Sequence, residues 1–255
     1  MDILDFHHPL GFIFGVLGNI VSIFVYVAPL LTFREIYRNK STLGFGSLPY
    51  VAGLFSAVLW LYYAFLASYA VLLISINSFG CIIETFYLAI YLAYASKEAR
   101  NHTAKLVGSL TVGVFSVVLI TQLCVEDSSR ATVVGWICVA ISVSVYAAPL
   151  SVMVKVVGTR SVEFMPFFLS FSLTLNAVIW FIHGLQQMDL CILAPNVIGF
   201  FLGATQMVMY GVHRNAKKTE KHPEHMIDIV TMGRAEVHPL DSQTSGSKID
   251  GVEED

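Results

Sequence analysis

Two asparagines and two tryptophans lie at matching positions of a hydrophobic chain, where their chemistry suits a neutral ligand rich in hydroxyl groups. Asn77 and Asn196 fall midway along two apolar segments, and Trp60 and Trp180 fall in two others. An amide side chain donates and accepts hydrogen bonds, as a sugar hydroxyl also does. The faces of two indoles suit the apolar C–H faces of a pyranose ring. This combination predicts a carbohydrate-binding site.

Each of these residues also has a structural interpretation. A lone membrane asparagine commonly joins helices by hydrogen bonds, and a lone tryptophan commonly lies in the interfacial belt. Repetition favours the binding site, because Trp60 and Trp180 are 120 residues apart and Asn77 and Asn196 are 119 apart. In duplicated membrane transporters the substrate site lies between the two copies, so equivalent residues face it from both.

The elements that position these residues are duplicated as well. The sequence SIFVYVAPL at residues 22–30 returns as SVSVYAAPL at 142–150, and AVLW at 57–60 returns as AVIW at 177–180. Such a repeat in a membrane protein indicates a transporter. We expect four parts: a first triple-helix repeat over 1–97, a linker helix with its loops over 98–130, a second triple-helix repeat over 131–213, and a disordered cytosolic tail over 214–255.

Composition places the repeats in a lipid bilayer. Of the 255 residues, 56% are hydrophobic and only 13% are charged, whereas a soluble domain carries about 25% charged residues. A helix needs about 20 apolar residues to cross the hydrocarbon core. We predict an all-α membrane protein with seven transmembrane helices, three in each repeat and one linker. The predicted spans are residues 10–31, 46–67, 70–95, 106–124, 132–154, 165–185 and 190–212.

Basic residues fix the predicted orientation. Fourteen of the 15 Lys and Arg residues follow the first, third, fifth and seventh spans, and only Arg130 falls on the other side. Cytoplasmic loops carry an excess of Lys and Arg. We therefore expect the N-terminus outside and the C-terminus in the cytosol.

Acidic residues are nearly absent from the spans. Glu84 is the only one near the centre of a helix, and its repeat equivalent is Gly203. Coupling to an ion gradient usually needs several intramembrane carboxylates. The sequence therefore favours an uncharged substrate that moves down its own gradient, with Glu84 as a structural acid. The alternative is a proton-coupled transporter of the PQ-loop type that uses Glu84.

Four prolines predict hinges at one membrane face. Pro29 and Pro149 fall near the ends of the first and fifth spans, and Pro49 and Pro166 fall early in the second and sixth. A proline inside a helix removes a backbone hydrogen bond and kinks the helix. The alternative is that these prolines are simply tolerated, as is common in membrane helices.

At this point the sequence resembles a known family, the SWEET sugar transporters of plants, and is most similar to its sucrose-transporting branch. The resemblance covers about residues 10–214. The motifs that carry it are Ala28-Pro29 and Ala148-Pro149, Lys40-Ser41-Thr42 with Pro49-Tyr50, Ile76-Asn77-Ser78-Phe79-Gly80, Ser161-Val162-Glu163-Phe164-Met165-Pro166, and Pro195-Asn196-Val197-Ile198-Gly199. It implies two parallel triple-helix bundles joined by the fourth helix, and bidirectional, ion-independent uniport of sucrose or hexose. It also implies a plasma-membrane location and a homo-oligomer.

The resemblance also implies a role for individual residues. Asn77, Asn196, Trp60 and Trp180 match the family's sugar site. A second group matches positions that shape the pocket below the sugar: Ser22, Val25, Ser56, Ser142, Val145 and Asn176. The four prolines match a cytosolic gate, and Tyr63 with Asp189 matches an extracellular gate.

Two positions depart from the family pattern. His183 stands where a tyrosine is common, which predicts an outer gate that either differs in its contacts or responds to pH. Asn176 faces Ser56, where relatives that carry sucrose often have a second small residue, so its bulk favours a hexose. The remaining motifs favour sucrose, and both sugars stay candidates.

Other classes of protein fit the sequence less well. A G-protein-coupled receptor has no three-helix repeat, and a retinal protein needs a lysine inside its last helix. The cysteines show no paired spacing of a metal or redox motif. No catalytic nucleophile or paired carboxylate points to an enzyme. We expect no cofactor, no metal and no nucleic-acid partner.

Overall fold

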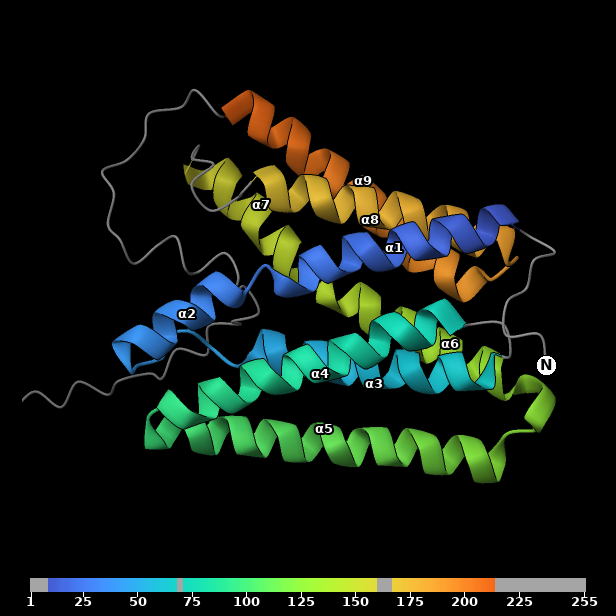
Figure 1. The fold of residues 1–255 in the computed structure, drawn as a ribbon, viewed down its shortest axis with the longest axis horizontal. Helices are drawn as coiled ribbons and strands as arrows, with labels where there is room; N and C mark the ends of the chain where they lie inside the picture. Colours follow the sequence, from blue (N-terminus) through green and yellow to red (C-terminus); the bar gives the residue numbers. More distant parts are fainter. Residues whose placement is uncertain (1–8, 68–70, 160–166, 214–255) are drawn as a thin grey trace, which may run out of the picture.

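The structure is a computed structural model that describes residues 9–67, 71–159 and 167–213. Every regular element in these ranges is an α-helix (Figure 1). The helices are α1 (Pro9–Val27), α2 (Leu30–Asn39), α3 (Leu48–Leu66), α4 (Val71–Tyr94), α5 (Lys97–Cys124), α6 (Asp127–Val145), α7 (Ala147–Thr159), α8 (Phe167–Gln186) and α9 (Leu190–His213). Seven segments are long and apolar enough to cross a membrane, with α1 and α2 counted as one. The predicted fold class is confirmed. The predicted tail at 214–255 lies outside the described residues.

Two predicted spans are each broken into two helices. α1 ends at Val27 and α2 starts at Leu30, while α6 ends at Val145 and α7 starts at Ala147. A proline inside a helix clashes with the carbonyl group four residues earlier, which for Pro29 belongs to Val25. The second break lies at Tyr146, just before Pro149 in the sequence. Each of the predicted spans 10–31 and 132–154 therefore ends inside a second, shorter helix. The predicted interruption at Pro29 is confirmed.

Pro49 does not act as a kink. It is the second residue of α3, where the backbone N–H of any residue would lack an intrahelical acceptor. The lost hydrogen bond that motivated a hinge therefore does not exist at this position. Pro166 lies outside the described residues.

The linker helix α5 begins at Lys97, well before the predicted start at residue 106. Ser96 caps it, because its hydroxyl accepts the backbone N–H of Ala99 at 3.2 Å. Hydropathy locates the apolar part of a helix and misses polar turns that project beyond the bilayer, such as those carrying Lys97, Arg100 and Lys105.

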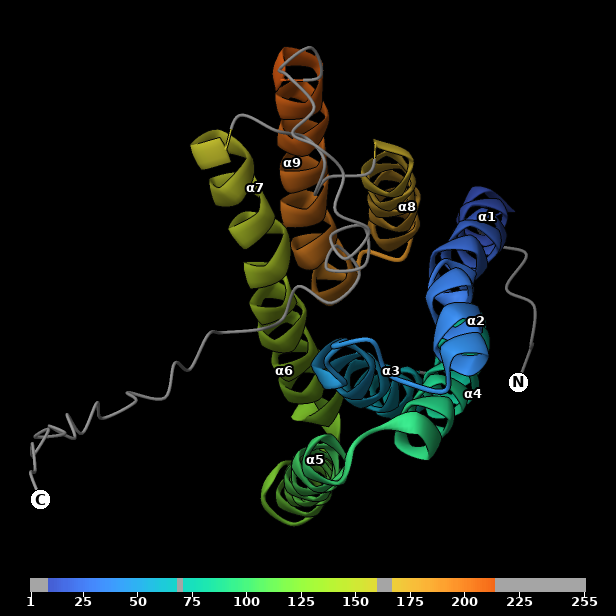
Figure 2. The ribbon, with the colours of Figure 1, turned by 90° about the vertical axis from the view of Figure 1, so that its left-hand side faces the viewer.

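The helices form two bundles of three with the same internal arrangement. In the first, α4 packs against both α1 and α3, and in the second, α9 packs against both α6 and α8. The bundles meet where α1 packs on α8 and where α3 packs on α6, and these two contacts are exchanged by the repeat. Figure 2 shows α2 beside α4 and α7 beside α9, while α5 lies against α3 and α6.

The two ends of the molecule differ in charge. α2, the start of α5 and α7 lie at one end, called here the α2 end, and they carry Arg34, Arg38 and Lys155 among other basic residues (Figure 1). The opposite end, where α1 begins and α3 ends, is called the Tyr63 end. Arg130 is the basic residue that the sequence analysis placed at this end. It caps the C-terminus of α5 by donating to the carbonyl groups of Thr121 at 2.9 Å and Val125 at 3.1 Å. Arg130 is thus a structural residue.

Candidate functional site

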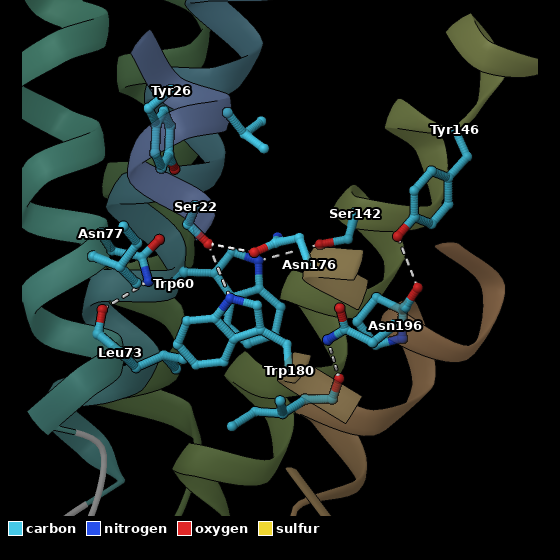
Figure 3. A pocket seen from close by; sticks show the side chains of 14 residues that line it. Ser22, Tyr26, Trp60, Leu73, Asn77, Ser142, Tyr146, Asn176, Trp180 and Asn196 are labelled. Carbon is cyan, nitrogen blue, oxygen red and sulfur yellow. Dashed lines mark hydrogen bonds between the residues drawn. The ribbon is translucent and has the colours of Figure 1, made fainter. Parts of the chain in front are cut away.

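A cavity of about 340 Å³ lies between the two bundles, lined by both (Figure 3). Twelve of its 14 lining residues form six repeat-related pairs. The pairs are Ser22 with Ser142, Tyr26 with Tyr146, Trp60 with Trp180, Leu73 with Ile192, Ile76 with Pro195, and Asn77 with Asn196; Val25 and Asn176 complete the lining. The cavity thus brings together the four residues that first suggested a carbohydrate site.

The two asparagines are held in the same way by their own helices. The Asn77 amide donates to the carbonyl group of Leu73 at 2.8 Å, and the Asn196 amide donates to that of Ile192 at 2.7 Å. Each side chain is therefore fixed to the turn before it. Within the described part of the chain, no hydrogen bond is seen at the amide oxygen or the second N–H of either side chain. Figure 3 shows the two asparagines on opposite sides of the cavity.

Each of the two tryptophans forms a hydrogen bond with a serine of the other bundle. The Trp180 indole of α8 donates to the Ser22 hydroxyl of α1 at 3.0 Å, and the Trp60 indole of α3 donates to the Ser142 hydroxyl of α6 at 3.2 Å. Both bonds satisfy the single polar atom of an otherwise apolar ring. They also fix the planes of both rings at the cavity wall, as Figure 3 shows.

The symmetry of the cavity fails at the pair formed by Ser56 and Asn176. The Ser22 hydroxyl donates to the Asn176 side-chain oxygen at 2.8 Å. Ser56 of α3 is not among the residues that line the cavity. Val145 does not line it either, since it is the last residue of α6 and is 48% exposed. Of these three residues predicted to shape the pocket, the cavity lining includes Val25 but not Ser56 or Val145.

Sequence reasoning missed the two tyrosines of the cavity, Tyr26 and Tyr146. Each lies over a glycine one turn after an asparagine: a Cβ atom on Gly80 would lie 2.6 Å from the Tyr26 hydroxyl, and one on Gly199 would lie 2.7 Å from the Tyr146 hydroxyl. Tyr146 donates to the Pro195 carbonyl group at 2.7 Å. The signal was available, since both tyrosines belong to the repeated sequence at 22–30 and 142–150.

The Tyr63 end is closed across the bundles. The Tyr63 hydroxyl of α3 donates to the Asp189 carboxylate at 2.6 Å, and both residues are buried. The other oxygen of Asp189 accepts the backbone N–H groups of Cys191 at 2.9 Å and Ile192 at 3.3 Å, so this carboxylate also caps α9. The two residues suggested for an outer gate are in direct contact.

Glu84 lies away from the cavity, inside the first bundle. Its carboxyl group packs against Gly53 of α3, where a Cβ atom would lie 2.7 Å from one oxygen. The other oxygen is buried and has no hydrogen-bond partner among the described residues, and the same holds for the hydroxyl of Tyr50. A buried polar atom without a partner is costly, so Glu84 is not an ordinary packing residue.

Comparison with known proteins identifies the family. The family model described as "Sugar efflux transporter for intercellular exchange" matches residues 12–99 and 132–218, which are the two repeats. The chain belongs to the SWEET family. It is 52% identical to the bidirectional sugar transporter N3 of Medicago truncatula, with 85% of this chain and 83% of the relative covered. It is 50% identical to SWEET13 of Arabidopsis thaliana, with 87% and 79% covered.

A solved structure supports the same family at the level of the fold. The 3.7 Å structure of a eukaryotic SWEET transporter superposes with a TM-score of 0.77 at 31% sequence identity, over 81% of this chain and 98% of the other. The SWEET chain described here is thus a multi-pass membrane protein with the two-bundle architecture of its family.

Proposed function

We propose that this SWEET protein carries sugars across a membrane in both directions by alternating access, without coupling to an ion. The observation that carries the proposal is the cavity between the bundles, where six repeat-related pairs include two fixed asparagines and two fixed tryptophans. Both bundles contribute equally, so a rocking movement of one against the other would expose the cavity first at one end and then at the other. The Tyr63–Asp189 contact is the gate of the closed end.

Sucrose and hexoses are both proposed substrates. Paired amides and indoles suit either, because each offers hydroxyl groups at its edge and C–H groups on its face. Asn176 narrows the cavity on the side of α8 and uses its oxygen for Ser22. The narrowed wall favours a hexose, which has a single ring. The remaining similarity to the sucrose-transporting branch favours a disaccharide.

Uniport is proposed because the residues that line the cavity include no acid.

A proton-coupled mechanism through Glu84 remains the second candidate, favoured by its buried oxygen, which has no hydrogen-bond partner among the described residues. Glu84→Gln keeps the shape and removes the charge. We expect this variant to exchange sugar at near the original rate and to ignore a pH gradient. Accumulation of sugar against its gradient that disappears in Glu84→Gln would instead establish proton coupling.

The placement in the cell follows from charge and from family resemblance. We propose that the basic α2 end faces the cytosol, with the N-terminus outside, and that the protein resides in the plasma membrane as a homo-oligomer. We also propose the division of the chain at residues 97, 130 and 213 into repeat, linker, repeat and cytosolic tail.

The decisive experiment is transport of labelled sucrose and glucose into liposomes that contain the purified protein. Asn77→Ala and Asn196→Ala should each abolish transport, because a hydroxyl of the bound sugar would lose its partner at a cost of about 1–3 kcal/mol. Asn19→Ala is the matched control. Asn19 also donates to the carbonyl group four residues earlier, at 3.0 Å, and to that of Leu72 at 2.9 Å, but it does not line the cavity.

The control separates binding from helix packing. Asn19→Ala should lower the yield or thermal stability while each folded molecule still transports. Normal transport by both cavity variants would place the substrate site elsewhere. Loss of folded protein in both would make Asn77 and Asn196 structural residues.

A further inference from the structure

The closed gate at the Tyr63 end contains a second contact between the bundles. The Nδ1 atom of His183 in α8 lies 2.8 Å from the carbonyl oxygen of Gly11 in α1. Because a carbonyl oxygen only accepts, Nδ1 carries the hydrogen. The histidine side chain is 4% exposed. We propose that His183 is a second latch of this gate, which holds α8 to α1 as Tyr63 holds α3 to α9. The proposal rests on the transport function proposed above.

The position of His183 repeats that of Tyr63. The two residues are 120 apart in sequence, and each packs edge-on against the cavity tryptophan three residues before it. The ring centres of Trp60 and Tyr63 are 5.6 Å apart at an interplanar angle of 89°, and those of Trp180 and His183 are 5.3 Å apart at 89°. Both gate residues therefore contact a ring that lines the substrate cavity.

Each gate residue also fits into a glycine of the opposite bundle. A Cβ atom on Gly15 of α1 would lie 2.9 Å from His183 Nδ1, and one on Gly135 of α6 would lie 2.8 Å from Cε2 of Tyr63. Gly15 and Gly135 are themselves 120 residues apart. The repeat thus preserves the tryptophan, the gate residue and the glycine that receives it, while the chemistry of the gate residue changes from phenol to imidazole.

The two latches differ in what they bind. Tyr63 binds a side chain, whereas His183 binds the backbone near the start of α1. Opening the Tyr63 end requires both bonds to break, since α3 and α8 face different helices of the opposite bundle. A sugar that moves either tryptophan would disturb the gate residue packed against that ring. Each half of the cavity is therefore coupled to one latch. His183 acts here as a positioning residue, because it does not line the cavity.

Opening of this gate can be measured without sugar, through Cys191. This thiol is buried beside Tyr63 and Gly135, with its sulfur 2.5 Å from where a Gly135 Cβ atom would lie. The full-length protein in liposomes would be treated with a membrane-impermeant maleimide from the Tyr63 side. Cys124 is exposed and Cys81 is partly exposed, so both are replaced by serine in every variant to leave Cys191 as the reporter and Cys138 fully buried.

The variants test the hydrogen bond itself. His183→Leu removes the donor and should raise the labelling rate of Cys191 about 3- to 10-fold, the range that one lost hydrogen bond supplies. His183→Gln retains a side-chain N–H and should restore slow labelling. Tyr63→Phe is the positive control. Because the two latches lie on different helices, the double variant should multiply the two increases.

Three results would overturn the proposal. One is unchanged labelling in His183→Leu while Tyr63→Phe labels faster, and another is equally fast labelling in His183→Leu and His183→Gln. If His183→Leu does not fold, Gly15→Ala crowds the His183 ring and Leu72 from the side of α1 and should give the same increase. Slow labelling in Gly15→Ala is the third result. Absence of sugar transport in the parent protein would defeat the proposed function while leaving these labelling results intact.

Discussion

The two bundles have the same arrangement of helices but different interiors at the α2 end. In the first bundle, Phe33 stacks on Tyr87 with ring centres 4.4 Å apart, and Tyr50 meets Phe33 edge-on at 4.8 Å. All three rings are buried. The equivalent residues of the second bundle are Met153, Ser170 and Gln206. One copy of the repeat therefore has an aromatic core where the other has flexible and polar side chains.

Further contacts join the helices of the first bundle. The Lys40 ammonium group lies 3.8 Å from the ring centre of Tyr37 and donates to the Tyr94 hydroxyl at 3.1 Å, which joins the end of α2 to the end of α4. Tyr91 donates to the carbonyl group of Phe45 at 2.9 Å. Aromatic pairs add about 0.5–1.5 kcal/mol each beyond their burial. The difference indicates that duplication preserved the residues of the cavity while the supporting halves diverged. We expect the first bundle to be the rigid copy and the second the yielding one.

The largest expected effect concerns stability. Tyr87→Ala should lower the unfolding free energy by about 3–5 kcal/mol, the usual cost of deleting a buried aromatic ring. Its repeat equivalent Gln206→Ala should cost about 1–2 kcal/mol, since it removes little apolar contact. Thermal unfolding of the purified protein, followed by tryptophan fluorescence, would compare them. Equal shifts in melting temperature would mean that the aromatic cluster does not make the first bundle more rigid.

A second prediction concerns the helix breaks at the two equivalent prolines. Pro29→Ala and Pro149→Ala each restore a backbone donor and favour a continuous helix. The break between α6 and α7 should matter more, because we expect α7 to move relative to α9 while α2 stays fixed on α4. We expect Pro149→Ala to slow sugar exchange several-fold more than Pro29→Ala, with similar binding in both. A larger effect of Pro29→Ala would reverse the assignment of the moving bundle.

A third prediction concerns selectivity at the pair that breaks the symmetry of the cavity. Asn176→Ser should raise the ratio of sucrose to glucose transport, because it removes an amide from the wall and frees Ser22. Ser56→Asn should lower the ratio, by adding an amide on the other side. One altered group in a pocket changes discrimination about 10- to 200-fold at most. Competition uptake with both labelled sugars measures the ratio, and no change in either variant would show that these positions do not contact substrate.

The smallest expected effect compares the two latches in acid. Histidine can gain a proton as the pH falls, whereas tyrosine keeps its proton throughout the acid range. A charged ring is costly in the buried site formed by Gly15 of α1, Leu72 of α4 and Trp180 of α8, and only partly offset by the Asp189 carboxylate of α9. Acid on the Tyr63 side should therefore open the gate. Because maleimide reacts with the thiolate, whose fraction falls with pH, labelling of Cys191 is compared at each pH with labelling in His183→Gln. The ratio of the two rates should rise a few-fold in acid, and a constant ratio would assign any acid response to another group.

Much of the cavity was predictable because the repeat offset is visible in the sequence. Asn77 with Asn196 and Trp60 with Trp180 needed only the matching of two segments. The local geometry was not predictable in the same way. Which N–H of an asparagine returns to its own helix depends on rotamers, and whether Ser56 reaches the cavity depends on helix rotation. Hydropathy did not predict the start of α5 at Lys97 for a different reason. The mean hydropathy of a segment locates its apolar part and gives no signal for charged turns of the same helix.

The near-symmetry of the cavity has a consequence for how a sugar sits in it. A ligand rotated by half a turn about the axis between the bundles meets almost the same walls, so two orientations of an asymmetric sugar have nearly equal free energy. A transporter of this kind can therefore bind a sugar that enters in either orientation. The two orientations are distinguished by Val25 and Asn176, whose repeat partners do not line the cavity, and by the unlike pairs Leu73 with Ile192 and Ile76 with Pro195. The side chains at these six positions therefore set which orientation a bound disaccharide prefers.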